Sequence, residues 1–158
     1  MNPRILVVAL AGRLPAWAET ACAEYLQRMP RGFETRRIVL KPEPRDSGKP
    51  LERLLALEAK RIEASLPDGA RRVALDERGK DLTSERLARE LRRWLDEGTP
   101  TAFLIGGPDG LDPELRRGCG FALRLSSLTL PHSLAQLVLC EQLYRAATLL
   151  TGHPYHRE

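Results

Sequence analysis

Residues 123–150 read LRLSSLTLPHSLAQLVLCEQLYRAATLL, and this stretch decides the class of fold. It starts as an apolar strand, alternates leucine with hydroxyl side chains, and turns helical after Pro131 up to about residue 151. The helix is apolar on nearly every side, so it must be buried centrally or in a subunit interface, and we favour the interface. A strand that leads into a buried helix is the repeating unit of α/β proteins.

Short sequence patterns also predict where this helix begins and which of its sides is polar. Ser133 and Gln136 have the spacing of a capping box, which predicts a helix that begins at about residue 133. Glu141, Arg145 and Thr148 follow one another at i, i+4 and i+7 and predict a narrow polar stripe.

The same alternation runs through the whole chain, which predicts a single α/β domain over residues 1–158. Strand-like segments lie at 4–10, 33–41, 71–76, 101–105 and 122–128, and helical segments lie at 15–29, 51–66, 84–97, from 112 onward, and at 133–151. Parallel neighbours need crossover helices, so we expect a mostly parallel sheet covered on both faces. The segment KPEPRDSGKP at 41–50 is predicted to be a mobile loop.

Composition sets the outer limits on function. With 42% hydrophobic and 29% charged residues, the chain is typical of a globular protein in solution. Cys22, Cys119 and Cys140 are too widely spaced for a zinc site or a disulfide framework, so we expect buried free thiols, no metal and a cytoplasmic location. No apolar run has the length of a membrane span. Residues 1–60 carry 11 basic and 7 acidic side chains, which is compatible with a polyanionic partner or with a solvated surface.

Three loops follow strands at the edge where parallel sheets bind ligands. They are LDERG at 75–79, IGGPDG at 105–110, and the stretch LRLSSLTLPHSLAQ at 123–136, which runs from the last strand into the buried helix. The first two also fit ordinary turns. Neither a phosphate-binding loop nor a dinucleotide fingerprint occurs, which argues against a pyrophosphate-bearing cofactor and permits a cofactor without phosphate. His132 is a candidate general base, although a role at the helix start is the more common one.

The ending TGHPYHRE, residues 151–158, places titratable and aromatic side chains where chains usually fray. Together with LIGGPDGL at 104–111 and LSSLTLPHSLAQLVLCEQLYRA at 125–146, the HPYHRE ending resembles the RlmH family of the SPOUT superfamily. These enzymes methylate N3 of a pseudouridine in large-subunit ribosomal RNA. The likeness covers the whole chain, including the LDERG turn.

The resemblance implies a Rossmann-like parallel sheet with a C-terminal trefoil knot and a homodimer. It also implies that S-adenosyl-L-methionine is the cofactor and 23S ribosomal RNA, in the ribosome, the partner. The family's cofactor site corresponds to residues of the three loops: Leu75, Gly106, Gly107, Leu125, Ser126, Ser127, Leu128, Thr129 and Leu130. General topology rules argue against a knot, so that feature depends on the resemblance alone.

Methylation of an imide nitrogen requires its proton to leave and the resulting charge to be stabilised. We expect His153, Tyr155 and His156 to position the base and help to remove the proton, and Arg145 or Arg157 to stabilise the imidate. The base could be either histidine or solvent. A tail that only packs on a dimer partner, a non-catalytic ribosome-binding or assembly module, and a nucleotide-dependent oxidoreductase are the alternatives.

Overall fold

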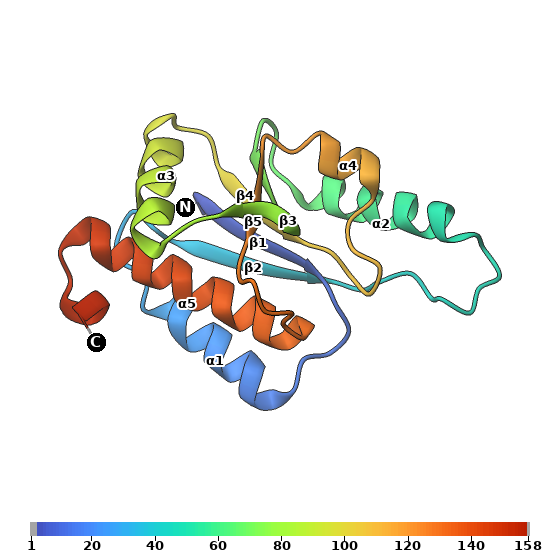
Figure 1. The fold of residues 1–158 in the computed structure, drawn as a ribbon, viewed down its shortest axis with the longest axis horizontal. Helices are drawn as coiled ribbons and strands as arrows, with labels where there is room; N and C mark the ends of the chain where they lie inside the picture. The colour runs from blue at the N-terminus through green and yellow to red at the C-terminus, as the bar shows by residue number, and fades with distance from the viewer. Residues whose placement is uncertain (1–2, 158) are drawn as a thin grey trace.

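The computed structural model describes residues 3–157, and its centre is one five-stranded sheet with the order β2-β1-β4-β3-β5 (Figure 1). Every pair of neighbouring strands is parallel. The strands are β1 Ile5–Leu10, β2 Thr35–Leu40, β3 Arg71–Asp81, β4 Thr101–Ile105 and β5 Phe121–Arg124. The predicted α/β class and the parallel sheet are therefore confirmed.

Helices cover both faces of this sheet. They are α1 Ala16–Gln27, α2 Leu51–Ser65, α3 Ser84–Asp96, α4 Pro113–Arg117 and α5 His132–Thr151, followed by the short 3-10 helix η1 Pro154–Arg157. Asp112 followed by Pro113 has the sequence pattern of a helix N-cap. The structure confirms this cap of α4, because the Asp112 side chain accepts a hydrogen bond from the Leu115 amide. Helices α1 and α5 lie side by side beneath the sheet in Figure 1.

Alternation along the interior strand β1 divides the core between the two faces. β1 is buried along its whole length. Its residues Ile5, Val7 and Ala9 pack with α3 and α5 on one face. The intervening residues Leu6, Val8 and Leu10 pack with α2 and α4 on the other. Because successive strand side chains point to opposite faces, an uninterrupted apolar strand is what a sheet covered on both sides requires.

Strands β3 and β5 differ most from the prediction. β5 ends at Arg124, and residues 125–130 form a loop instead of continuing the strand. β3 runs on to Asp81, with a shift of its pairing to β5 between Leu75 and Lys80. Gly79 lies so close to β5 that a Cβ atom there would come within 2.7 Å of the Ala122 and Leu123 carbonyl carbons. The predicted turn is thus an irregular part of β3 that only glycine fits.

The predicted capping box of α5 is wrong. The helix begins at His132, its N-cap is Pro131, and no side chain caps it. Gln136 is instead fully buried and bonded to Arg37. Thr148, expected on a polar stripe, is also fully buried, and its hydroxyl donates to the Arg145 carbonyl oxygen at 2.7 Å.

The remaining predictions on cysteines and loops have mixed outcomes. All three cysteines are free thiols, but only Cys22 and Cys140 are buried, whereas Cys119 is partly exposed. The loop 41–50 is predicted to be mobile, and Arg45 within it is bonded to buried Glu58.

Within residues 3–157, no helix has the length and hydropathy of a membrane span, and no group of three metal-binding side chains occurs. The C-terminal knot stays a prediction.

Candidate active site

The three sequence-predicted loops line one cavity of about 670 Å³ at the carboxyl ends of β3, β4 and β5. This volume lies within the range of small-molecule sites. All nine residues predicted to bind a cofactor line it: Leu75, Gly106, Gly107, Leu125, Ser126, Ser127, Leu128, Thr129 and Leu130. Leucine side chains supply apolar walls, and hydroxyl and peptide groups supply polar contacts. The cavity lining therefore suits a ligand that has both an apolar part and several hydrogen-bonding groups.

The glycine loop 105–110 forms one wall and is sterically restricted. The Gly110 amide donates to the Gly107 carbonyl oxygen at 3.1 Å and closes a tight turn. A Cβ atom on Gly106 would come within 2.4 Å of the Gly110 carbonyl carbon, whereas one on Gly107 would find its nearest neighbour at 3.5 Å. Gly106 is therefore required by the folding of the loop on itself, independently of any ligand.

Asp76 brings a negative charge to the same cavity. Burial acts to raise its pKa, but hydrogen bonds from the Arg78 amide at 2.7 Å and from the Arg116 side chain outweigh burial and hold the pKa below its ordinary value. Asp76 is therefore a carboxylate at neutral pH. Its partner Arg116 lies on α4, so the ion pair also fixes α4 against the end of β3.

His132 reaches the cavity at the end of a buried polar chain. Arg37 donates to Gln136 Oε1 at 2.7 Å, and Gln136 Nε2 lies 2.9 Å from His132 Nε2. Because the Gln136 oxygen already accepts from Arg37, its nitrogen must donate to the imidazole, which leaves the His132 proton on Nδ1. Burial lowers the pKa of His132 as well. His132 is thus held neutral, with its Nε2 lone pair occupied, and this argues against its use as a general base through that nitrogen.

The C-terminal tail, residues 153–157, folds back onto α5. The Tyr155 hydroxyl donates to Glu141 Oε2 at 2.8 Å, and its ring lies edge-on to Tyr144, with the centroids 4.6 Å apart. Arg145 donates to the same Glu141 oxygen and lies 5.1 Å from the Tyr155 ring centroid. Burial, together with Tyr25 and Glu141, raises the pKa of Tyr155 well above its ordinary value. Tyr155 is therefore a protonated hydrogen-bond donor at neutral pH.

The other tail residues are placed differently. His153 and Arg157 are exposed, and the His153 Nδ1 atom accepts from the Tyr155 amide at 3.2 Å. The Nδ1 atom of His156 is buried without a hydrogen-bond partner in the part of the chain that is described. The structure thus gathers four of the five predicted catalytic side chains, Arg145, His153, Tyr155 and His156, at one end of α5, with Arg157 following at the end of the tail.

The tail and the cavity lie at opposite ends of α5. His132 at the start of the helix lines the cavity, and the tail follows its last residue, Thr151. A helix of 20 residues is about 30 Å long at about 1.5 Å per residue. Figure 1 shows the C-terminus at the far end of α5 from the loop that enters it. The structure therefore does not bring the predicted catalytic residues to the cavity of their own chain.

Residues 1–156 match the family described as Predicted SPOUT methyltransferase. The Ribosomal RNA large subunit methyltransferase H of Bordetella avium (strain 197N) is 53% identical over 154 residues, which cover 98% of this chain and 99% of that protein. The enzyme of the same name from Verminephrobacter eiseniae (strain EF01-2) is 53% identical over 155 residues, with the same coverage. The chain belongs to the RlmH family of SPOUT methyltransferases.

Solved structures agree with a SPOUT fold. A probable methyltransferase from Bordetella pertussis Tohama I has a TM-score of 0.58 and 17% identity, and the match covers 92% of this chain and 96% of that one. A probable methylase family protein from Haemophilus influenzae Rd KW20 has a TM-score of 0.56 and 14% identity, with 98% and 71% covered. At these identities the likeness concerns the fold alone.

Two sets of contacts beside the candidate site in this RlmH-family chain were not predicted from the sequence. Glu141 holds both Arg145 and Tyr155, and the only signal for it was its spacing of four residues before Arg145. Arg37 and Gln136 fix the imidazole of His132, but they lie 99 positions apart along the chain. A contact of that sequence separation leaves no periodic trace in a single sequence.

Proposed function

We propose that this protein transfers a methyl group from S-adenosyl-L-methionine to N3 of a pseudouridine in 23S ribosomal RNA, in the ribosome and in the cytoplasm. The observation that supports it most is the cavity formed by the three predicted loops, in a chain that shares half its residues with enzymes named Ribosomal RNA large subunit methyltransferase H. The basic excess of residues 1–60 fits an RNA partner.

The cavity residues fit this cofactor chemically. Leu125, Leu128 and Leu130 offer apolar surface for an adenine ring, and Ser126 and Ser127 offer hydroxyl groups beside it. Asp76 is a carboxylate that can accept hydrogen bonds from ribose hydroxyls or an amino group. When bound, the cofactor supplies an electrophilic methyl group, and the chain has to align it with the acceptor and exclude water.

The second part of the proposal is that the tail acts in the site of a partner subunit of a homodimer. In-line transfer requires reacting atoms about 3–3.5 Å apart. The tail contacts α5 at Glu141, nine residues after His132, so about 14 Å of helix, at about 1.5 Å per residue, separates this contact from the cavity end of α5. Two copies related by a two-fold axis can place the tail of one beside the cavity of the other. Within one chain the buried face of α5 already packs against α1, α3 and the sheet, so such an interface would use the partly exposed side chains of the helix.

Within that site Arg145 and the tail residues have distinct roles. Arg145, on α5, or Arg157, in the tail, provides positive charge for the imidate that forms when N3 loses its proton. Tyr155 remains protonated, so it positions the acceptor, while His153 and His156 assist the removal of the proton. Glu141 keeps Arg145 and Tyr155 together, because one of its oxygens accepts from both.

Nucleoside mass spectrometry of ribosomal RNA tests this function. Cells that lack the gene should lack N3-methylpseudouridine, the full chain should restore it, and a chain truncated after Gly152 should not. Calorimetry of the purified proteins is the control, because the truncated chain keeps the cavity and should still bind S-adenosyl-L-methionine. A full chain that binds no cofactor and restores no methyl group would instead favour the ribosome-binding module.

A further inference from the structure

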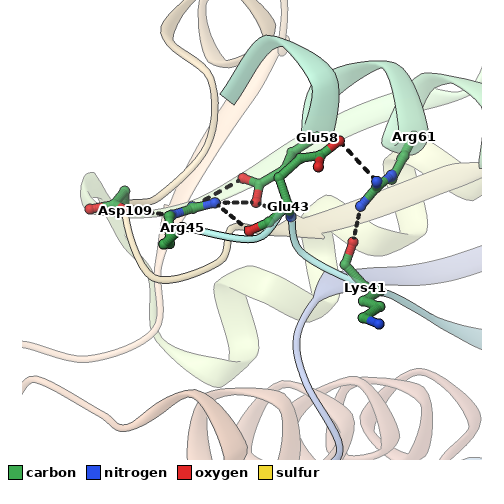
Figure 2. Close-up of polar contacts among 6 residues, drawn as sticks. All are labelled: Lys41, Glu43, Arg45, Glu58, Arg61 and Asp109. Atoms are coloured by element: carbon green, nitrogen blue, oxygen red, sulfur yellow. Dashed lines mark hydrogen bonds and ion pairs between the residues drawn. The ribbon is translucent and has the colours of Figure 1, made fainter. Parts of the chain in front are cut away.

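Three charged side chains link helix α2 to the tip of the glycine loop 105–110 (Figure 2). The carboxylate of Glu58 on α2 accepts hydrogen bonds from Arg45 Nη1 at 2.9 Å and from Arg45 Nη2 at 3.4 Å. On its other side, Arg45 Nε donates to Asp109 Oδ2 at 2.9 Å. Arg45 therefore bridges a carboxylate of the core and a carboxylate of the glycine loop.

The inner half of this bridge is firmly held. Glu58 is only 1% exposed, and it also accepts a hydrogen bond from the Glu43 amide at 2.9 Å. A buried carboxylate is costly unless it is paired, so Arg45 is retained beside it. Hydrogen bonds to Glu58 and Asp109 raise the pKa of Arg45 further, and Arg45 Nη1 also donates to the Glu43 carbonyl oxygen at 3.0 Å. The guanidinium is thus fixed in orientation from several directions.

The outer half of the bridge reaches the cavity wall. Asp109 lies between Pro108 and Gly110, inside the turn closed by the Gly107–Gly110 hydrogen bond. Pro108 and Gly110 line the cavity together with Gly106 and Gly107, whereas Glu58 and Arg45 do not. The bond between Arg45 and Asp109 is therefore the direct contact by which these two residues reach the loop.

We propose that Glu58 and Arg45 are positioning residues that hold the glycine loop in the conformation that binds the cofactor. Arg45 belongs to the segment 41–50, so the bridge also couples that segment to the cavity. A tight turn that is fixed before binding loses less conformational entropy on binding, and this raises affinity. The inference rests on the proposed function, because it concerns the same cofactor site.

Hydrogen exchange and calorimetry on the full-length protein test the bridge. Arg45→Met and Asp109→Ala should each speed amide exchange in the loop 106–111 and weaken S-adenosyl-L-methionine binding by about two- to fivefold, the range that a partly exposed ion pair supports. The double variant should weaken binding by that same factor and not by the product of the two, because both changes break one bridge. Multiplied effects would mean that Arg45 acts by another route.

Arg61→Met is the matched control. Arg61 contacts Glu43 and the Lys41 carbonyl oxygen in the same segment, but it does not contact Asp109 (Figure 2). Its replacement should leave exchange in the glycine loop and cofactor affinity unchanged. If it alters both as strongly as Arg45→Met, the segment acts as a whole and the bridge is not the cause.

Adding Glu58→Gln to Arg45→Met distinguishes a loss of loop positioning from a loss of overall stability. Arg45→Met leaves the charge of Glu58 buried and unpaired, so it should lower the unfolding temperature, and adding Glu58→Gln should recover part of that loss. Loop exchange and cofactor affinity should not recover, because Asp109 still lacks its partner. Recovery of both with the unfolding temperature would overturn the proposal. Should the wild-type protein bind no cofactor, the proposed function fails, while loop exchange still reports on the bridge.

Discussion

Mixed dimers provide a direct test of which subunit supplies the tail. One chain is truncated after Gly152 and keeps its cavity, and the other carries Ser127→Trp, which fills the cavity but leaves the tail intact. Ser127 is exposed in the cavity wall, so we expect the larger side chain to be tolerated by the fold. Two different affinity tags on co-expressed chains allow the mixed dimer to be purified from the two parental dimers.

The expected activity follows from counting complete sites. If a tail cannot reach the cavity of its own chain, the mixed dimer contains one complete site, formed by the truncated chain's cavity and the other chain's tail. Its rate of ribosomal RNA methylation should be about half that of the wild-type dimer, which has two sites. Each parental dimer should be inactive. If the tail served its own subunit, the mixed dimer would be inactive as well.

The reciprocal arrangement makes the test decisive. Both changes are placed in one chain, which is then paired with a wild-type chain. When tails act across the dimer, neither cavity of this pair has both parts, and methylation should be lost. When tails act within a chain, the wild-type subunit remains complete and about half the activity should persist. Activity in this second dimer combined with none in the first would refute the reasoning from the length of α5.

Other predictions concern single residues. Gly106→Ala should lower the free energy of unfolding by about 1–3 kcal/mol in chemical denaturation, because its Cβ would overlap the Gly110 backbone, whereas Gly107→Ala should change it by less than about 0.5 kcal/mol. Burial lowers the pKa of His132 below its ordinary value of 6.5. The stability that neutral His132 contributes is therefore complete above pH 6.5 and is lost as the pH falls through the pKa of the folded state. In denaturation at several pH values, the free energy of unfolding of His132→Gln should fall less steeply toward acid pH than that of the wild-type protein. Tyr155→Phe should loosen the tail by about 1 kcal/mol in hydrogen exchange, and the pH profile of methylation should keep its shape below pH 10, since the hydroxyl does not ionise there.

The sequence predicted correctly the elements that depend only on residues close together along the chain. The buried apolar run of β1 and the Asp112 cap of α4 need only neighbours along the chain, and both appear as expected. The cavity was also predictable, because parallel strands bring the loops that follow them to one edge of a sheet. Its nine predicted residues indeed share one cavity, although their binding of a cofactor remains a prediction.

Features that depend on distant partners were not predictable in the same way. Ser133 and Gln136 match a capping box, but a hydrogen bond to Arg37 draws Gln136 into the core and the helix starts one residue earlier. The alternating leucines and hydroxyl residues at 125–130 resemble a strand, yet β3 ends at Asp81, which pairs with Arg124, and offers no further edge for them to pair with. In both cases a tertiary contact outweighed a local preference.

The length and direction of α5 limit how two subunits can assemble into a methyltransferase. The helix has His132 and the cavity at one end and the tail at the other. A dimer in which the two copies of α5 run parallel would leave both tails at the end of the helices away from both cavities. A two-fold axis that crosses α5 at right angles near its middle makes the copies antiparallel and places each tail beside the opposite cavity. If the tail is catalytic, the antiparallel arrangement is therefore required, and the two sites are completed together when the dimer forms.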